Sequence, residues 1–202
     1  MFISDTFIIE ELKVLEESSS KGTMKIAGIF QRADTPNHNK RIYEKRLLLR
    51  EMDRLKVSLS ERRLMGELDH PSNDSVKLQN VSHLITKLTM RGNDMIGEAE
   101  ILNTPAGQVA QALIKGGVKL GISSRGMGSL SEGPDGFSMV SEDFKLVTFD
   151  LVADPSTKGA FPACVNESVA SGFIEETVKT VYDKAYSEKV LLTQLRKALN
   201  KK

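Results

Sequence analysis

The chain has 202 residues, 28 basic and 27 acidic side chains and a single cysteine. This length suits one well-cored domain with appendages, and the near balance of charge excludes a general case for a nucleic acid partner. No apolar run approaches the roughly 18 residues of a membrane span, the acidic start lacks a secretory signal, and the histidines at 38, 70 and 83 form no metal-binding pattern. We therefore expect a soluble protein without a metal or other cofactor, and without a membrane or specific nucleic-acid partner.

The first half of the chain alternates between strand and helix patterns. Alternation of polar and apolar residues predicts a strand over 23–33, and apolar residues at helical spacing predict a helix with a basic outer face over 43–57. Two alternating segments, 81–90 and 94–102, are joined by the turn sequence RGND, which indicates a β-hairpin.

The second half contains a short helix, more strands and a tail. Thr104 and Pro105 are a helix-starting pair, and Gly116 ends that helix. Strands are predicted over 118–130 and 137–154, so the body is α+β, mainly antiparallel strands with two helices. We expect a first domain over 1–165, followed by a linker and a helical tail over 166–202.

The stretch GISSRGMGSL at 121–130 carries a candidate nucleophile. It resembles the G-x-S-x-G turn of α/β hydrolases but has one residue too many and leads into a hairpin rather than a helix. In an extended strand, Ser123 and Arg125 share one face while Ser124 lies on the other. We therefore expect Ser123 to be the nucleophile. Arg125 and the backbone amide of Gly126 are candidates for stabilising the oxyanion or binding substrate.

A serine nucleophile needs a base and an orienting group. His70 is the candidate base, because it lies in the polar, geometrically restricted sequence GELDHP. His83 lies within a predicted strand, where a packed structural role is the more ordinary expectation. Asp150 is a charge inside an apolar strand, which is costly unless it is paired, and it is our candidate third member. Glu67 and Asp69 remain competitors, as does a structural ion pair between Asp150 and a buried arginine.

Five segments together resemble the prohead core proteases of T-even-like tailed phages: NKRIY at 39–43, GELDHP at 66–71, RGND at 91–94, GISSRGMGSL at 121–130 and FDLVADPS at 149–156. That family is similar in fold to the herpesvirus assemblins, which implies a bent, barrel-like antiparallel sheet flanked by helices. Carried over by motif, the family's histidine falls on His70 and its serine on Ser123. Herpesvirus relatives use a second histidine as third member, so the resemblance leaves Asp150 and His83 open.

The resemblance implies a serine endopeptidase inside the phage prohead, in the host cytoplasm, that cuts scaffold and capsid proteins and then itself. It implies cleavage after glutamate in aliphatic-small-Glu sequences, with Arg125 as one candidate to bind that glutamate, and association into a homo-oligomer. The alternative is a catalytically silent protein of capsid assembly that binds scaffold. Self-cleavage is expected mainly in the tail, where Ile174-Glu175-Glu176 and Val165-Asn166-Glu167 approximate the preferred sequence.

Overall fold

The computed structural model describes residues 2–6, 23–71, 74–154 and 162–165. Contacts along the chain separate two units, Met1–Val165 and Asn166–Lys202. The predicted linker and tail helix lie outside the described residues, so the proposed domain boundary stays a prediction. No helix within the described ranges is long and apolar enough to cross a membrane.

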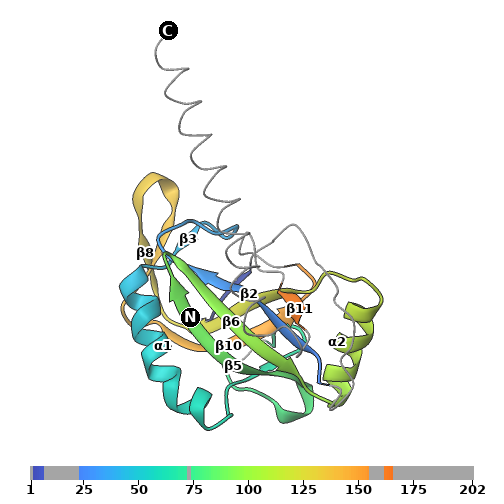
Figure 1. Ribbon diagram of the computed structural model, residues 1–202. Coiled ribbons are helices and arrows are strands. Elements are labelled where there is room, and N and C mark those ends of the chain that lie inside the picture. Colours follow the sequence, from blue (N-terminus) through green and yellow to red (C-terminus); the bar gives the residue numbers. More distant parts are fainter. Residues whose placement is uncertain (1, 7–22, 72–73, 155–161, 166–202) are drawn as a thin grey trace. The chain divides into compact units, whose positions relative to one another are not determined.

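The larger sheet has five strands in the order β11-β2-β6-β5-β4 (Figure 1). Their bounds are β2 Lys25–Arg32, β4 Met65–Glu67, β5 Val81–Arg91, β6 Asp94–Ile101 and β11 Ala163–Val165. All its pairings are antiparallel. The predicted strand over 23–33 and the predicted hairpin around RGND are therefore confirmed. The short strands β4 and β11 were not predicted.

Two three-stranded sheets complete the strand structure, in the orders β1-β7-β10 and β3-β9-β8. Their bounds are β1 Phe2–Thr6, β7 Gly121–Met127, β10 Lys145–Val152, β3 Arg41–Ile42, β8 Leu130–Glu132 and β9 Ser138–Val140. Only β3 and β9 pair in parallel among these described strands. The predicted α+β, mainly antiparallel architecture is confirmed.

The two predicted helices are present, as α1 (Lys45–Ser60) and α2 (Pro105–Lys115), and they flank the strands on different sides in Figure 1. The Thr104 hydroxyl accepts a hydrogen bond from the Gly107 amide at 3.1 Å, which is the expected N-cap. Two short 3₁₀ turns occur at Leu78–Asn80 and Pro134–Gly136. The basic face of α1 is partly engaged rather than freely solvated, because Arg50 and Arg54 donate to backbone carbonyls before and within β10.

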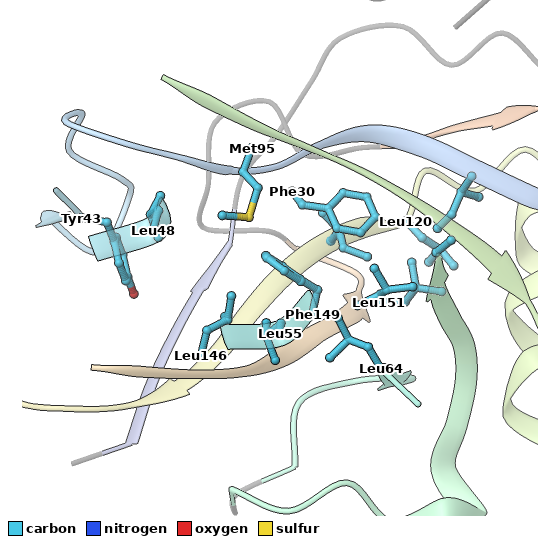
Figure 2. Packing of buried hydrophobic residues seen from close by; sticks show 14 of the residues in the cluster. Phe30, Tyr43, Leu48, Leu55, Leu64, Met95, Leu120, Leu146, Phe149 and Leu151 are labelled. Atoms are coloured by element: carbon cyan, nitrogen blue, oxygen red, sulfur yellow. The ribbon is translucent and has the colours of Figure 1, made fainter. Parts of the chain in front are cut away.

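One apolar core joins the five-stranded sheet, the β1-β7-β10 sheet and both helices (Figure 2). Phe30 of β2 and Phe149 of β10 meet across it, with ring centroids 5.3 Å apart in an edge-to-face arrangement. Leu48 of α1 and Ile114 of α2 are buried in the same cluster. The sheet that carries the candidate serine is therefore held against the larger sheet by side chains of β7 and β10.

The alternation of β7 separates a core face from an opposite face. Ile122, Ser124 and Gly126 pair with Leu151, Phe149 and Leu146 of β10, and these leucines and Phe149 belong to the core. Ser123 pairs with Asp150, and Arg125 pairs with Thr148. Because directly opposed residues share a face, Ser123 and Asp150 lie together on the face turned away from the core.

A one-residue bulge in β10 makes this arrangement possible. The pairing shifts between Leu146 and Thr148, which leaves Val147 without a partner in the register. Regular pairing continued from Leu146 would place Phe149 opposite Ser123 and Asp150 opposite Ile122. Since a one-residue slip moves every side chain to the other face, the bulge is what brings Asp150 to the face of Ser123.

Candidate active site

Ser123, His70 and Asp150 form one continuous chain of polar contacts. His70 Nε2 lies 2.5 Å from Ser123 Oγ, and His70 Nδ1 lies 2.8 Å from Asp150 Oδ2. Ser123 and Asp150 come from adjacent strands, and His70 comes from the segment that follows β4. The structure thus brings together the three residues nominated as nucleophile, base and orienting acid.

The segment after β4 delivers His70 by pairing with the end of β10. Leu68 forms a parallel bridge with Leu151, and the Asp69 amide donates to the Leu151 carbonyl at 2.7 Å. Asp69 adopts φ 64°, a conformation that aspartate tolerates better than most residues, and this turns the chain so that His70 faces Asp150. The Asp69 side chain is exposed, and His70 Nδ1 contacts Asp150 instead, so the competitor at this position is not the residue behind the imidazole.

The carboxylate fixes the tautomer of His70. An ionised Asp150 only accepts hydrogen bonds, so His70 carries its proton on Nδ1 and donates it to Oδ2. The Nε2 lone pair then faces the Ser123 hydroxyl, which donates to it. In this arrangement the imidazole is ready to remove the serine proton.

Asp150 is fully buried and is compensated from several directions. Its Oδ1 accepts from the Glu67 amide and from Arg125 Nη2, each at 3.0 Å. Arg125 Nε lies 2.8 Å from Oδ2, close enough for an ion pair although not aligned as a hydrogen bond. The structural ion pair considered as an alternative is therefore present together with the contact to His70. The two interpretations of Asp150 are compatible.

Arg125 lies beside Asp150, within the protein. Its side chain has 0% exposed surface, Nη2 lies 2.7 Å from Glu67 Oε2, and Nη1 donates to the Ser75 carbonyl at 3.0 Å. To reach a substrate or an oxyanion, the guanidinium would have to leave both carboxylates. The predicted contacts of Arg125 with substrate gain no support from this placement.

Glu67 is occupied by the same cluster. It is buried, contacts Arg125 through Oε2 and accepts from the Lys77 amide through Oε1 at 2.8 Å. Its own backbone amide donates to Asp150. Glu67 was a competitor for the position behind His70. Its carboxylate contacts Arg125, whereas the carboxylate that contacts His70 is that of Asp150. Sequence reasoning missed the Ser75 and Lys77 contributions, because backbone groups carry no side-chain signal.

Ser124 and Gly126, two residues on the core face of β7, have packing roles. The Ser124 hydroxyl accepts from Gln31 Nε2 of β2 at 3.1 Å, and its side chain is buried. Gly126 is opposed by Ile3 on one side and Leu146 on the other, and a Cβ there would lie 2.4 Å from the ring of Phe144. Packing therefore explains the glycine, and its role as an oxyanion donor stays a prediction.

His83 is a neutral structural histidine. It is fully buried, and its Nε2 donates to the Phe149 carbonyl at 3.1 Å, so Nδ1 accepts from the Ser82 hydroxyl at 2.9 Å. Burial lowers the pKa of His83 to about 4, with partial opposition from the Asp150 charge and the Phe149 carbonyl. Gly66 allows this packing, because a Cβ there would lie 2.3 Å from the imidazole.

The three groups have the order and reach needed for acyl transfer. A hydroxyl bound to an imidazole, itself held by a carboxylate, is the arrangement that serine hydrolases use on several unrelated folds. Ser123 has no exposed surface, whereas 18% of the His70 side chain is exposed. A peptide reaches the hydroxyl only if the surrounding chain moves. Within the described residues, no group of three or more metal-binding side chains is clustered.

Comparison with known proteins places the chain in a family. The model of the family described as prohead core protein serine protease matches residues 4–185. The chain is 34% identical over 173 residues to the prohead core protein protease of Enterobacteria phage T4, spanning 80% of this chain and 81% of that protein. A solved structure of the bacteriophage T4 capsid assembly protease is similar with a TM-score of 0.68 and 30% identity, over 76% of this chain and 98% of that one.

The chain therefore belongs to the prohead core protein serine protease family, and it is a protease of phage capsid maturation. The family resemblance predicted from the five sequence segments is confirmed. The motifs at 66–71, 121–130 and 149–156 contribute His70, Ser123 and Asp150 to one cluster.

Acid should destabilise the fold through His83. Its pKa of about 4 in the folded chain lies below the ordinary 6.5, so the unfolded chain binds a proton first as the pH falls. This titration leaves the free energy of unfolding unchanged above pH 6.5 and lowers it by about 3 kcal/mol by about pH 4. Denaturant unfolding of the wild type and His83→Gln between pH 7 and 4 measures it. The variant should lose less stability on acidification, and parallel curves would contradict the prediction.

Proposed function

We propose that this protease is a serine-type endopeptidase whose catalytic residues are Ser123, His70 and Asp150. The observation that carries the proposal is the continuous contact from hydroxyl to imidazole to carboxylate, at 2.5 Å and 2.8 Å. Supporting it, the family is described as a serine protease family. Reactivity further requires that Ser123 be uncovered, because its side chain is buried.

The geometry suggests how the reaction proceeds. Ser123 Oγ attacks the scissile carbonyl carbon while its proton passes to His70 Nε2, and Asp150 stabilises the resulting imidazolium. The tetrahedral intermediate collapses when His70 returns the proton to the leaving amine, which leaves an acyl-enzyme on Ser123. A water molecule, deprotonated by His70, then attacks the ester and releases the acid product with Ser123 restored.

The substrates we propose are scaffold and capsid proteins within the phage prohead, in the host cytoplasm. The support is the relatives' names, a prohead core protein protease and a capsid assembly protease. Cleavage after glutamate in aliphatic-small-Glu sequences, and association into a homo-oligomer, belong to the same proposal. They rest on the family resemblance.

Labelling with a fluorophosphonate probe tests the catalytic assignment. The wild type should become modified at Ser123, and Ser123→Ala should remove the label, while Ser124→Ala should retain it because that hydroxyl contacts Gln31 on the core face. Asp150→Asn should slow labelling by about 10⁴, since His70 then takes the wrong tautomer. Peptide mapping over a time course identifies the modified residue. If neither serine is labelled, the assignment of Ser123 as the nucleophile is wrong.

For Arg125 we propose a positioning role, in which it holds Asp150 and Glu67 and does not contact substrate. Arg125→Lys should then lower kcat/KM by about a hundredfold, because a single ammonium cannot reproduce the forked contacts and misplaced catalytic groups lose this much. The loss should be the same for peptides cut after Glu and after Gln. Steady-state kinetics with the matched pair measures this. A loss confined to the Glu peptide would favour recognition of the substrate glutamate instead.

Self-cleavage should remove part of the tail, after Glu167 or Glu176. The better sequence matches, Leu59-Ser60-Glu61, Ile96-Gly97-Glu98 and Leu130-Ser131-Glu132, lie at the end of α1 and within β6 and β8, where a protease has poor access to backbone. Intact-mass analysis follows the 22.3 kDa chain over time. Ser123→Ala should stay intact. A wild-type chain that remains whole while it cuts a peptide substrate rules the idea out.

A further inference from the structure

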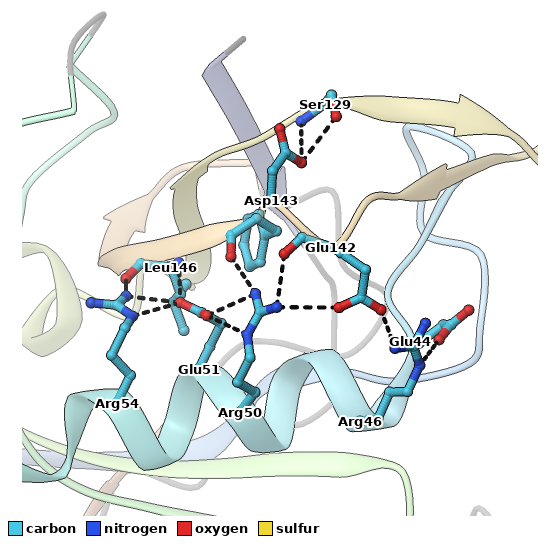
Figure 3. Close-up of polar contacts among 10 residues, drawn as sticks. Glu44, Arg46, Arg50, Glu51, Arg54, Ser129, Glu142, Asp143 and Leu146 are labelled. Atoms are coloured by element: carbon cyan, nitrogen blue, oxygen red, sulfur yellow. Dashed lines mark hydrogen bonds and ion pairs between the residues drawn. The ribbon is translucent and has the colours of Figure 1, made fainter.

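The bulge in β10 that precedes Asp150 is bound by side chains of α1, which lies outside the catalytic cluster. Glu51 has 1% exposed surface, and its Oε2 accepts from the Leu146 amide at 2.8 Å (Figure 3). Arg54 Nη2 donates to the Leu146 carbonyl at 2.5 Å. Both backbone groups of the residue immediately before the unpaired Val147 are therefore bound by one helix.

Glu51 is the centre of this contact. Its carboxylate accepts from Arg50 Nε at 3.0 Å and from Arg54 Nε at 2.9 Å, so both arginines compensate its buried charge. Arg50 also donates to the Phe144 carbonyl at 2.6 Å and to the Glu142 carbonyl at 2.7 Å. Three backbone carbonyls and one amide of the segment 142–146 are thus held by consecutive turns of α1.

These contacts cover the edge of β10 that faces away from β7. Further along the same strand, that edge is covered by the β4 segment, through Thr148 Oγ1 to the Met65 carbonyl at 2.7 Å and through the bridge between Leu68 and Leu151. The register changes where α1 gives way to β4, at Val147. An exposed strand edge with unpaired backbone groups is a liability, and here the buried Glu51 and the partly exposed Arg50 and Arg54 replace a neighbouring strand.

We propose that Glu51 is a positioning residue for catalysis: by binding the Leu146 amide it holds the bulge that keeps Asp150 on the face of Ser123 and His70. The inference rests on the proposed function of Asp150. Loss of the carboxylate would free the Leu146 amide and loosen both arginines, and any drift of the register moves Asp150 away from His70. The arginines are 43% and 46% exposed, so water can solvate them when Glu51 is replaced, and the fold should persist.

The test compares Glu51→Met with Glu51→Gln by fluorophosphonate labelling and peptide turnover. Glu51→Met should lower kcat by about a hundredfold with little change in KM, since displacement of a catalytic group by about 1 Å costs this much. Glu51→Gln retains an acceptor for the Leu146 amide and should recover most of the rate. Ile114→Ala, a core truncation in α2, is the control for lost stability and should keep the wild-type kcat.

A double-mutant cycle separates positioning from a general structural effect. If Glu51 acts through Asp150, Glu51→Met should slow labelling by less than about threefold in the Asp150→Asn background. The inference is overturned if Glu51→Met causes the same hundredfold loss in both backgrounds. It is also overturned if Glu51→Met lowers kcat no more than Ile114→Ala does, or does not lower it. If Asp150→Asn alone has no effect, the proposed function of Asp150 has failed instead. Should Glu51→Met not fold by circular dichroism, Arg54→Met replaces it, with about a tenfold loss expected from the freed Leu146 carbonyl.

Discussion

The structure of the site depends on the compensation of one buried carboxylate. Asp150 has no exposed surface and lies inside a strand, where an isolated charge would cost several kcal/mol. His70, Arg125 and the Glu67 amide share its two oxygens. Arg125 comes from β7, and Glu67 and His70 come from β4 and the residues directly after it, so a single anion in β10 determines where three parts of the chain meet. The same contacts that make the charge tolerable also set the direction and tautomer of the imidazole.

Two histidines close to this anion show how environment separates function from structure. His70 lies beside the carboxylate with part of its ring exposed, and its second nitrogen faces a hydroxyl. His83 is fully buried between Ser82 and the Phe149 carbonyl, and the low pKa keeps it neutral. Both rings lie near Asp150, but the second nitrogen of His70 faces Ser123, the proposed nucleophile, whereas that of His83 accepts from Ser82. His83 therefore binds the strand that carries Asp150. In a herpesvirus-like arrangement, a second histidine would instead be the third member of the catalytic group.

Much of this site could be predicted from the sequence because its signals are local. Strand alternation placed Ser123 and Arg125 on one face, and an acid inside an apolar strand singled out Asp150. The role of Arg125 could not be read in the same way. Its partner Glu67 lies 58 positions earlier, in the short strand β4, and nothing in the sequence indicates that this strand lies next to β10. The bulge at Val147 was equally hidden, since the apolar run LVTFDLV does not reveal where one residue is skipped.

The bulge resolves a conflict between two requirements on β10. The core needs Leu146, Phe149 and Leu151 on one face, yet an unbroken strand puts Leu146 on the face opposite to the other two. Skipping Val147 satisfies the core and simultaneously places Asp150 beside Ser123. Hydrophobic packing and catalytic geometry thus favour the same register, and the Glu51 contact adds a polar interaction at the residue where the change occurs. Because burial of leucines determines most of the register, the helix contact has only to fix the exact position of Asp150. The proposed proton transfer between Ser123 and His70 requires that precision.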